Sequence, residues 1–269
     1  MVTQSRVVMS PPVYFDIEYS INPWMDTNNK VNPARAKTQW ETLKDTYLRI
    51  GLGVLTIPPV AGLPDLVFTT DHGVFIGDTF YLSNFRYSER QKEQVITIPW
   101  YKKQNIKIQP IPSLCYMEGG DVFFHHNHIY LGYGFRTSLN TAEYLSNTTH
   151  YPVTQLELVD EAFYHLDTCF LPLSSDTAFY YPLAFTSDGI KSLKAQFDIL
   201  IPLTSHEAES FASNSVVIGK NVICQPCPSF EQKLMDLGYI PIPLDMHEFN
   251  KSGGGIHCLS QIHTTRKYV

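Results

Sequence analysis

No apolar run in this 269-residue chain approaches the roughly 18 residues that a helix needs to cross a bilayer, so we expect no membrane-spanning helix. Positive charge is also scarce, because 20 lysines and arginines stand against 26 aspartates and glutamates, a formal net charge of −6. Phosphate binding needs a basic face, so nucleic acid is not expected as a partner. Residues 1–6 lack the charged, apolar and small-residue regions of a signal peptide, and we expect a cytoplasmic protein.

Two further shortages concern the organisation of the chain. No Gly/Ser-rich linker or low-complexity tract divides it, so residues 1–269 are expected to form a single domain. Five cysteines are an odd number in a chain large enough to fold without disulfides, which predicts reduced thiols, one of them a candidate reactive group. A homo-oligomer is compatible with this composition.

Small hairpin-like units recur along the chain at a nearly constant interval. Their first strands are expected to reach Asp71, Asp121, Asp167, Asn214 and Cys258, at steps of 50, 46, 47 and 44 residues. A repeat of this length indicates modules arranged in a ring, and reactive residue types at equivalent positions indicate one shared central pocket. The repeat therefore favours an enzyme.

Each unit reads as a strand, a turn, a returning strand and a polar helical stretch. The clearest unit has apolar runs at 66–71, 73–76 and 80–82, with a Gly-Asp turn at 77–78. The corresponding strand pairs are expected at 121–124 and 129–131, 169–173 and 178–181, and 215–218 and 222–224. The fifth unit begins at 257–259, and the N-terminal strand at 7–9 is expected to complete it and close the ring.

Helical stretches are predicted between these hairpins, at 33–50, 88–94, 138–146, 189–197 and 229–238. Within each unit the chain turns back too soon for a pure parallel crossover, which needs a dozen or more residues. The pattern therefore predicts an α/β propeller-like barrel rather than an open parallel sheet.

Cys258 follows three consecutive glycines in the stretch Ser-Gly-Gly-Gly-Ile-His-Cys at 252–258. Glycines let the backbone approach a ligand closely and expose N–H groups beside the thiol, which suits a nucleophile that reacts as a thiolate. On this interpretation Cys258 is alkylated faster than the other four cysteines. The alternative is a flexible turn before a buried structural cysteine.

His165 and Asp167 flank a leucine in a stretch that reads as extended, so alternation places both side chains on one face. A neutral imidazole can protonate a departing amine and later activate water. The neighbouring carboxylate orients the imidazole or binds a cationic substrate. The alternative is an ordinary surface or core pair.

Carboxylates also cluster before two other hairpins. Glu118 and Asp121 surround two glycines, and Asp71 ends an apolar strand, where a carboxylate needs a charged or hydrogen-bonded partner. Taken alone, the first pair reads equally as solvated acids in a turn. Together with a cysteine and a histidine, at least three acids exceed what a peptidase site requires. Such a pocket suits a planar cation rich in donors, and guanidinium fits best.

Other clusters rank lower. His126 and His128 have metal-ligand spacing but fall in a hairpin turn, and Cys224 with Cys227 has redox spacing without a thioredoxin-like context. No metal and no other cofactor is expected.

The ordered motifs resemble the guanidino-modifying enzymes of the pentein fold, a superfamily that includes arginine deiminase, dimethylarginine dimethylaminohydrolase, amidinotransferases and arginine dihydrolase. The shared segments are Phe-Thr-Thr-Asp at 68–71, Glu-Gly-Gly-Asp at 118–121, His-Leu-Asp-Thr at 165–168 and Gly-Gly-Ile-His-Cys at 254–258. Stretches at 10–12, 21–25, 89–91, 133–136 and 163–170 further resemble the arginine dihydrolase domain. The resemblance implies a five-bladed α/β propeller with pseudo-fivefold ββαβ-type repeats around a central pocket.

The resemblance also implies roles for particular residues. Cys258 attacks the guanidinium carbon. His165 protonates the departing nitrogen and then activates water, and Glu118 holds His165. The implied substrate ligands are Asp71 and Asp167 for the guanidinium nitrogens, which Glu118 also contacts, and Arg90 and Arg136 for the α-carboxylate. Asp121 and Asn22, the latter in a substrate-side loop, are further candidate substrate ligands. Residues 23–32 are rich in turn formers and are a candidate lid.

Two residues bear on substrate and product. Asp167 resembles the enzymes that accept unmethylated amidino groups, which favours free arginine or a close analogue. Asp71 stands where arginine dihydrolases typically carry asparagine, and deiminases have aspartate there. We therefore expect a cysteine hydrolase that releases citrulline and ammonia. The alternatives are arginine dihydrolase (giving ornithine, CO₂ and ammonia), dimethylarginine dimethylaminohydrolase, amidinotransferase, and a non-catalytic binder of the same fold.

Overall fold

The computed structural model describes residues 2–267 and contains five three-stranded sheets. Each sheet joins an antiparallel strand pair, a hairpin in four of the sheets and the two chain ends in the fifth, to a third strand that runs parallel to the second strand of the pair. In spatial order the sheets are β15 (Gln261–Lys267), β1 (Val2–Met9) and β2 (Gly53–Thr56); β3 (Gly73–Ile76), β4 (Thr79–Leu82) and β5 (Lys107–Pro110); β6 (Val122–His125), β7 (His128–Tyr133) and β8 (Val153–Glu157); β9 (Phe170–Pro172), β10 (Thr177–Tyr180) and β11 (Ile199–Pro202); and β12 (Val216–Ile218), β13 (Asn221–Cys224) and β14 (Ile240–Pro243).

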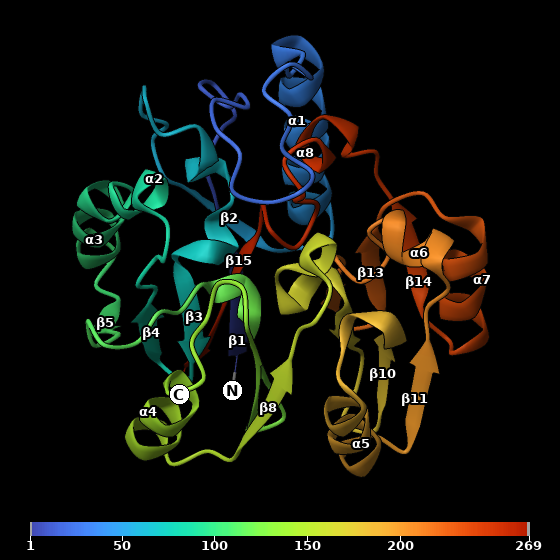
Figure 1. Cartoon of the computed structure of the whole chain (residues 1–269). Helices are drawn as coiled ribbons and strands as arrows, with labels where there is room; N and C mark the ends of the chain where they lie inside the picture. The colour runs from blue at the N-terminus through green and yellow to red at the C-terminus, as the bar shows by residue number, and fades with distance from the viewer. Residues whose placement is uncertain (1, 268–269) are drawn as a thin grey trace.

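In the described part of the chain, eight helices lie between the strands. They are α1 (Pro33–Arg49), α2 (Ser88–Gln91), α3 (Gln94–Lys103), α4 (Thr141–Thr149), α5 (Ser187–Gln196), α6 (Ser205–Glu209), α7 (Pro228–Asp236) and α8 (His247–Asn250). Helices α6 and α8 link the third strand of one sheet to the next sheet, and the others connect the second strand of a sheet to the third. Helices α1, α3, α4, α5 and α7 lie around the outside of the strands (Figure 1). Each sheet with its helix is one blade, so the predicted five-bladed α/β ring is confirmed. Between residues 2 and 267, no helix is both long and apolar enough to span a membrane.

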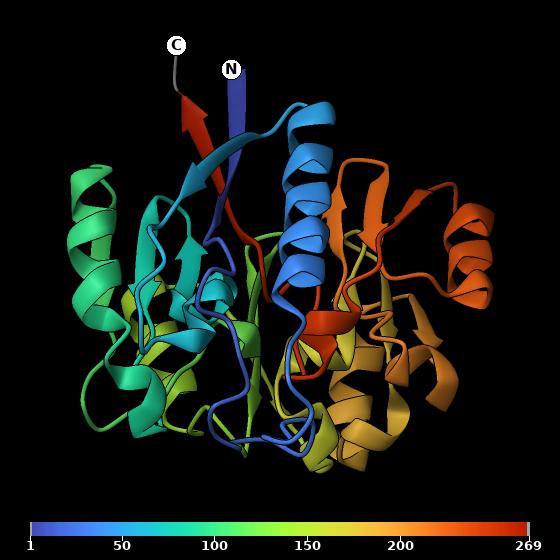
Figure 2. The same ribbon diagram turned by 90° about the horizontal axis from the view of Figure 1, so that it is seen from above.

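The two ends of the chain close the ring, as predicted. β1 pairs antiparallel with β15, with Val7 opposite Ile262, and parallel with β2, with Val7 opposite Val54. The N- and C-terminal strands therefore lie side by side (Figure 2). Because Cys258 lies directly before β15, this pairing holds the cysteine segment at the centre.

Helix α1 forms because its sequence carries both a start signal and an apolar stripe. Asn32 accepts a hydrogen bond from the Arg35 backbone N–H, and proline occupies the first helical position. Trp40, Leu43 and Tyr47 recur at helical spacing and are all buried. The predicted helix at 33–50 is confirmed to within one residue.

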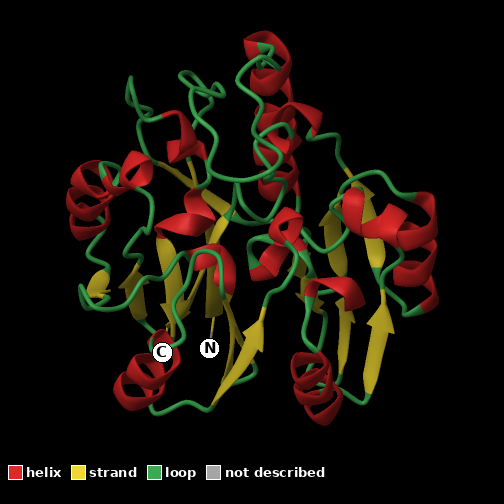
Figure 3. Cartoon of the chain, viewed as in Figure 1, coloured by secondary structure: helices red, strands yellow, loops and turns green. Residues whose placement is uncertain are grey.

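The segments before three hairpins differ from the prediction. We expected strands to run up to Asp71 and an extended stretch through His165 and Asp167. Instead, short 3-10 turns precede the strands: η2 (Thr69–His72), η3 (Gly119–Asp121) and η5 (Leu166–Thr168). Turn η3 contacts both η2 and η5. Short helical segments of this kind lie near the centre of the molecule in Figure 3. Hydrophobicity alone could not distinguish a buried turn from a buried strand.

Other differences concern helices. The predicted helix at 88–94 is two helices, α2 and the longer α3, which contains Pro99. Helix α7 begins at Pro228 rather than at Ser229, and Cys227 is its N-cap residue. The short helices α6 and α8 were not predicted, because each has too few residues to show a period.

The packing of α1 against the cysteine segment predicts a measurable loss on substitution. The Tyr47 hydroxyl is fully buried and donates to Ser260 Oγ at 2.7 Å. We expect Tyr47→Phe to lower the free energy of unfolding by about 1 kcal/mol, because one buried hydrogen bond is lost while Ser260 still donates to the Ile256 carbonyl. Urea denaturation measures the change. Tyr14→Phe, at a half-exposed position, is the control, and equal effects in the two variants would contradict the prediction.

Candidate active site

One segment from each blade brings a side chain to the centre of the ring. Asp71 lies in η2, Glu118 directly precedes η3, and His165 directly precedes η5. Asn214 and Cys258 lie before β12 and β15. All five side chains are at most 3% exposed, so the site is nearly closed to bulk water.

The Cys258 thiol is held by two polar neighbours. Its Sγ lies 3.1 Å from Nδ2 of Asn214, which donates to it, and 3.3 Å from Oδ2 of Asp167. Oδ1 of Asn214 accepts the backbone N–H groups of His257 and Cys258. Asn214 thus fixes both the backbone and the sulfur of the cysteine. It was not predicted as a site residue, although it occupies the repeat position of the fourth blade.

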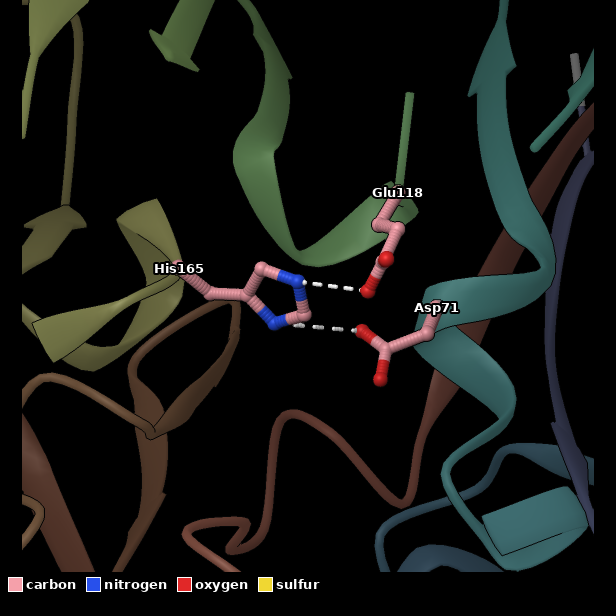
Figure 4. A group of neighbouring side chains, drawn as sticks. All are labelled: Asp71, Glu118 and His165. Atoms are coloured by element: carbon pink, nitrogen blue, oxygen red, sulfur yellow. Dashed lines mark hydrogen bonds and ion pairs between the residues drawn. The ribbon is translucent and has the colours of Figure 1, made fainter. Parts of the chain in front are cut away.

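The His165 imidazole lies between two carboxylates, as Figure 4 shows. Nε2 is 2.9 Å from Oε2 of Glu118, and Nδ1 is 3.6 Å from Oδ1 of Asp71. Gly120 makes this approach possible, since a Cβ at that position would lie 2.8 Å from both Asp71 Oδ1 and His165 Nδ1. The predicted association of His165 with Glu118 is therefore present in the structure.

The charges of this cluster shift one another's titration. Burial alone lowers the pKa of His165, but Asp71, Asp121 and Glu118 outweigh it and raise this pKa to about 9. Burial likewise raises the pKa of Glu118, but Arg136 and His165 outweigh it and lower this pKa to about 2. The imidazole is consequently protonated at neutral pH and can donate a proton, but it cannot accept one.

Two buried arginines balance the acids. Arg136 donates to Oε2 of Glu118 at 3.0 Å and to the Ile21 carbonyl at 2.9 Å, and its guanidinium lies over the rings of Tyr87 and Tyr164. It links the N-terminal segment to the catalytic cluster.

Arg90 makes more hydrogen bonds within the protein than Arg136. It bonds Glu93 through two N–H groups at 2.8 and 3.0 Å, and it also donates to Asp71 and to the backbone carbonyl of Asp65. Arg90 therefore positions Asp71.

Several buried acceptors at the centre have no hydrogen-bond donor within the described side chains (residues 5–263). They are Oδ1 of Asp71, Oε1 of Glu118, Oδ2 of Asp121 and Oδ1 of Asp167. Buried polar atoms normally have partners, so this set indicates a ligand that supplies donors. Asp71, Glu118 and His165 also have ligand atoms within 4.8 Å of one another, but the protonated imidazole has no lone pair for a metal ion, so a guanidinium held by the carboxylates fits this cluster better.

Asp121 supports the histidine segment. Its Oδ1 accepts the backbone N–H of Leu166 at 3.0 Å, directly beside His165. Burial raises the pKa of Asp121 to about 7. Its other oxygen is one of the unpartnered acceptors, so it remains a candidate substrate ligand.

The expected low pKa of the nucleophile is not found in the free protein. Burial raises the pKa of the Cys258 thiol well above its ordinary value, and Asp167 and Asp71 add to this effect, whereas Asn214 and the Gly255 backbone only partly oppose it. The prediction of fast alkylation took the glycine N–H groups into account but not the two carboxylates. A cation bound among these acids would reverse the balance.

The glycine-rich stretch permits close packing around the cysteine. A Cβ on Gly254 would lie 2.4 Å from the Phe68 ring, and one on Gly255 would lie 2.9 Å from Oδ1 of Asn214. The backbone therefore approaches both neighbours as the triple glycine indicated.

The segment that contains Asn22 lies against the glycine-rich stretch. The Asn22 side chain donates to the Ser252 carbonyl at 3.1 Å and caps the Trp24 backbone N–H, and the Trp24 indole donates to the Ala162 carbonyl. Farther along, the Lys251 ammonium reaches the Lys30 carbonyl. The candidate lid at 23–32 is thus fastened at several points.

The lower-ranked clusters do not form sites in the described part of the chain. His128 Nε2 pairs with Thr154 Oγ1, and no group of metal-ligand spacing there includes His126 or His128. Cys224 and Cys227 are buried free thiols, and burial raises the pKa of Cys224 to about 12.

Comparison with known proteins places this geometry in context. Residues 15–263 match the family model described as N,N dimethylarginine dimethylhydrolase, eukaryotic. The N(G),N(G)-dimethylarginine dimethylaminohydrolase of Mycobacterium tuberculosis is 36% identical over 261 residues, covering 96% of this chain and 86% of that protein. The bifunctional arginine dihydrolase/ornithine cyclodeaminase of Synechocystis is 34% identical over 267 residues, covering 97% of this chain but only 38% of that protein.

Solved structures give the same relationship. The N-terminal domain of a cyanobacterial arginine dihydrolase, a cysteine-to-serine variant bound to substrate, superposes with a TM-score of 0.91 at 32% identity, covering 96% of this chain and 98% of that chain. A dimethylarginine dimethylaminohydrolase from Pseudomonas aeruginosa superposes with a TM-score of 0.82 at 19% identity, over 98% and 100% of the two chains. The latter supports the fold alone.

The coupling between Glu118 and His165 can be measured directly. We expect Glu118→Gln to lower the pKa of His165 below about 9, because one of the carboxylates that raise it is lost while burial still lowers it. Titration of the imidazole by NMR measures the change. Glu143→Gln, at an exposed position on the outer helix α4, removes the same charge outside the His165 cluster and should leave the pKa of His165 unchanged. An unchanged pKa in Glu118→Gln would show that the pair does not control the histidine.

Proposed function

We propose, because this chain belongs to the dimethylarginine dimethylaminohydrolase family, that it hydrolyses free arginine or a close analogue to citrulline and ammonia through a covalent thiouronium intermediate. Membership of the pentein superfamily, and of its hydrolases that act on C–N bonds of amidines, is as predicted from the sequence. The observation that carries the proposal is the set of unpartnered, buried carboxylate oxygens on acids that also contact the cysteine thiol or the protonated histidine.

In the first half of the proposed reaction, the guanidinium binds among Asp71, Asp167 and Glu118. Its donors satisfy the unpartnered oxygens, and its charge stabilises the Cys258 thiolate, which the free protein disfavours. The sulfur attacks the guanidinium carbon. His165 gives its proton to the departing nitrogen, and ammonia leaves.

In the second half, the neutral His165 accepts a proton from water, which attacks the thiouronium carbon. The carbon–sulfur bond breaks, and citrulline and the cysteine are released. Glu118 keeps the imidazole in place throughout, through the 2.9 Å contact. In support, a variant of the cyanobacterial arginine dihydrolase domain, a relative of this chain, has been solved covalently bound to a reaction intermediate.

The α-carboxylate of the substrate is proposed to meet Arg136 and Arg90. One N–H group of Arg136 donates to the Ile21 carbonyl, so displacement of the N-terminal segment would make this N–H group available to the substrate. Arg90 contributes in the free protein mainly by holding Asp71. Asn22 would take part through the same displacement, because it fastens this segment to Ser252.

Asp167 favours an unmethylated substrate, since a dimethylated nitrogen has no proton to donate to its unpartnered Oδ1. Dimethylarginine hydrolysis is the second candidate, because the family model and the mycobacterial relative bear that name. Hydrolysis to ornithine is the third, from the cyanobacterial relatives, and amidino transfer is the fourth. We further propose that residues 1–269 form one catalytic domain of a cytoplasmic protein whose partner is a small molecule.

Product analysis tests the reaction. Wild-type protein supplied with arginine is expected to release citrulline and ammonia, and Cys258→Ser is expected to lose on the order of 10³-fold or more in kcat/KM, because no thiolate remains to attack. Mass spectrometry separates the candidates. Ornithine without citrulline would identify a dihydrolase, and dimethylamine from dimethylarginine as the faster reaction would identify a dimethylaminohydrolase. Turnover that survived Cys258→Ser would rule out covalent catalysis by this residue.

Asp71 is expected to decide whether citrulline is released or attacked again. Its carboxylate pairs well with the cationic guanidinium but poorly with the neutral ureido group, so citrulline should leave the site. We expect Asp71→Asn to raise KM for arginine and to yield a measurable fraction of ornithine, since an amide can donate to the ureido oxygen. Asp78→Asn, at an exposed turn position, is the control. Citrulline as the sole product of Asp71→Asn would contradict this role.

A further inference from the structure

A cavity, called the second cavity here to distinguish it from the candidate active site, lies among the hairpins of the ring. It has a volume of about 430 Å³, and its walls include the exposed turn residues Gly77, Asp78 and Asn127, so it opens at the hairpin-turn end of the ring. None of its wall residues is Arg90, Arg136 or Asn22, the groups proposed to face the rest of the substrate. The cavity and the substrate side are therefore distinct.

His257 joins this cavity to the nucleophile. It lies in the cavity wall with its side chain 16% exposed, and its Nδ1 is 2.8 Å from Oδ2 of Asp167. The same Oδ2 lies 3.3 Å from the Cys258 sulfur. Thiol, carboxylate, imidazole and cavity thus form a continuous chain of contacts, and the Phe123 ring packs against the imidazole from the side.

The reaction needs a destination for the thiol proton. Burial and the neighbouring acids keep the thiol protonated in the free protein, and the proton must leave before the sulfur can attack. His165 already carries a proton and cannot accept another. Glu118 is bonded to Arg136 and His165. Among the described contacts of the sulfur, Asp167 is the acceptor, and bound substrate would cover the opposite side.

We propose that His257 receives the Cys258 proton through Asp167 and releases a proton to water in the second cavity. His257 starts as the neutral tautomer with its proton on Nε2. The S–H proton moves to Oδ2 of Asp167 and then to Nδ1 of His257, and the proton on Nε2 leaves to a cavity water. One proton enters the chain and one leaves it, and proton exchange with cavity water restores the starting tautomer before the next turnover. This inference rests on the proposed function, and it makes the residue beside the nucleophile a proton relay that acts through Asp167.

The charged and titratable surroundings of His257 are few. Asp167 from η5 and the Cys258 thiol face it on the catalytic side, and Asp78 and Tyr151 belong to the cavity wall. A relay therefore predicts that the ionisation of Cys258 depends on His257 more than on any group on the cavity side.

Two substitutions separate a relay from a merely structural role. His257→Asn fills the same space with an amide that cannot carry a proton, and His257→Ala leaves space that opens into the cavity. We expect both to lower arginine turnover by roughly 10²-fold with little change in KM. We also expect both to move the pH profile of Cys258 alkylation by iodoacetamide, read by peptide mass spectrometry, about one unit higher.

Added imidazole provides the discriminating measurement. It should restore turnover and the alkylation profile in His257→Ala in proportion to its concentration, but not in His257→Asn, where the site is filled. His128→Asn, which removes a histidine bonded to Thr154 outside the site, is the matched control and should behave as wild type.

Clear results would overturn the relay. Wild-type turnover and alkylation in His257→Asn would show that His257 only holds Asp167 in place, and absence of imidazole rescue in His257→Ala would exclude proton transfer through this position. Circular dichroism verifies that each variant is folded. If the wild-type protein turned over no guanidino substrate, the proposed function would fail, whereas the alkylation profiles, which need no turnover, would still decide the relay.

Discussion

The whole structure depends on keeping several carboxylates buried and charged at the centre of the ring. A buried charge without a partner is very costly, so each acid must face a cation or a donor. Arg136 forms an ion pair with Glu118, Arg90 forms one with Asp71, and the protonated His165 lies between the two acids. Among the side chains that the structure describes, one oxygen on each of Glu118, Asp71 and Asp167 still has no donor. The site is therefore electrostatically incomplete until a cation enters it.

The five-bladed fold meets this demand through repetition. Each blade ends its connection with a short buried segment at the axis, and five such segments converge without needing a long loop. Glycines at 120, 254 and 255 remove the side chains that would keep the segments apart. The closing pair of β1 and β15 also positions the candidate nucleophile, because it holds Cys258 near segments from other blades.

Much of this could be predicted from the sequence, because the repeat interval and hairpin turns are local patterns. The ring, its closure and α1 follow from apolar alternation, turn residues and helical spacing. The turns η2, η3 and η5 could not be distinguished from strands, since buried turns and buried strands are equally apolar. Asn214 shows a second limit, because an amide in an apolar stretch gives no local sign of a thiol 44 residues away. Likewise, the raised pKa of Cys258 depends on distances to Asp167 and Asp71, and spacing along the chain does not encode these.

The same cluster ties the stability of the protein to its chemistry. His165 has a pKa raised to about 9, so its contribution to stability is complete below its unfolded value of about 6.5 and is lost as the pH rises through about 9. Glu118 has a pKa lowered to about 2, so its contribution is complete above about 4.5 and is lost as the pH falls through about 2. Asp121 behaves in the opposite sense to Glu118: its pKa is raised to about 7, and its contribution to stability declines as the pH rises from about 4 through 7.

At neutral pH the protein therefore keeps most of the stabilisation from His165 and Glu118 but loses much of the stabilisation from Asp121. A bound guanidinium would offset that loss, because it supplies positive charge beside the Asp121 carboxylate that forms as the pH rises. Substrate binding and folding are thus linked through one set of buried charges.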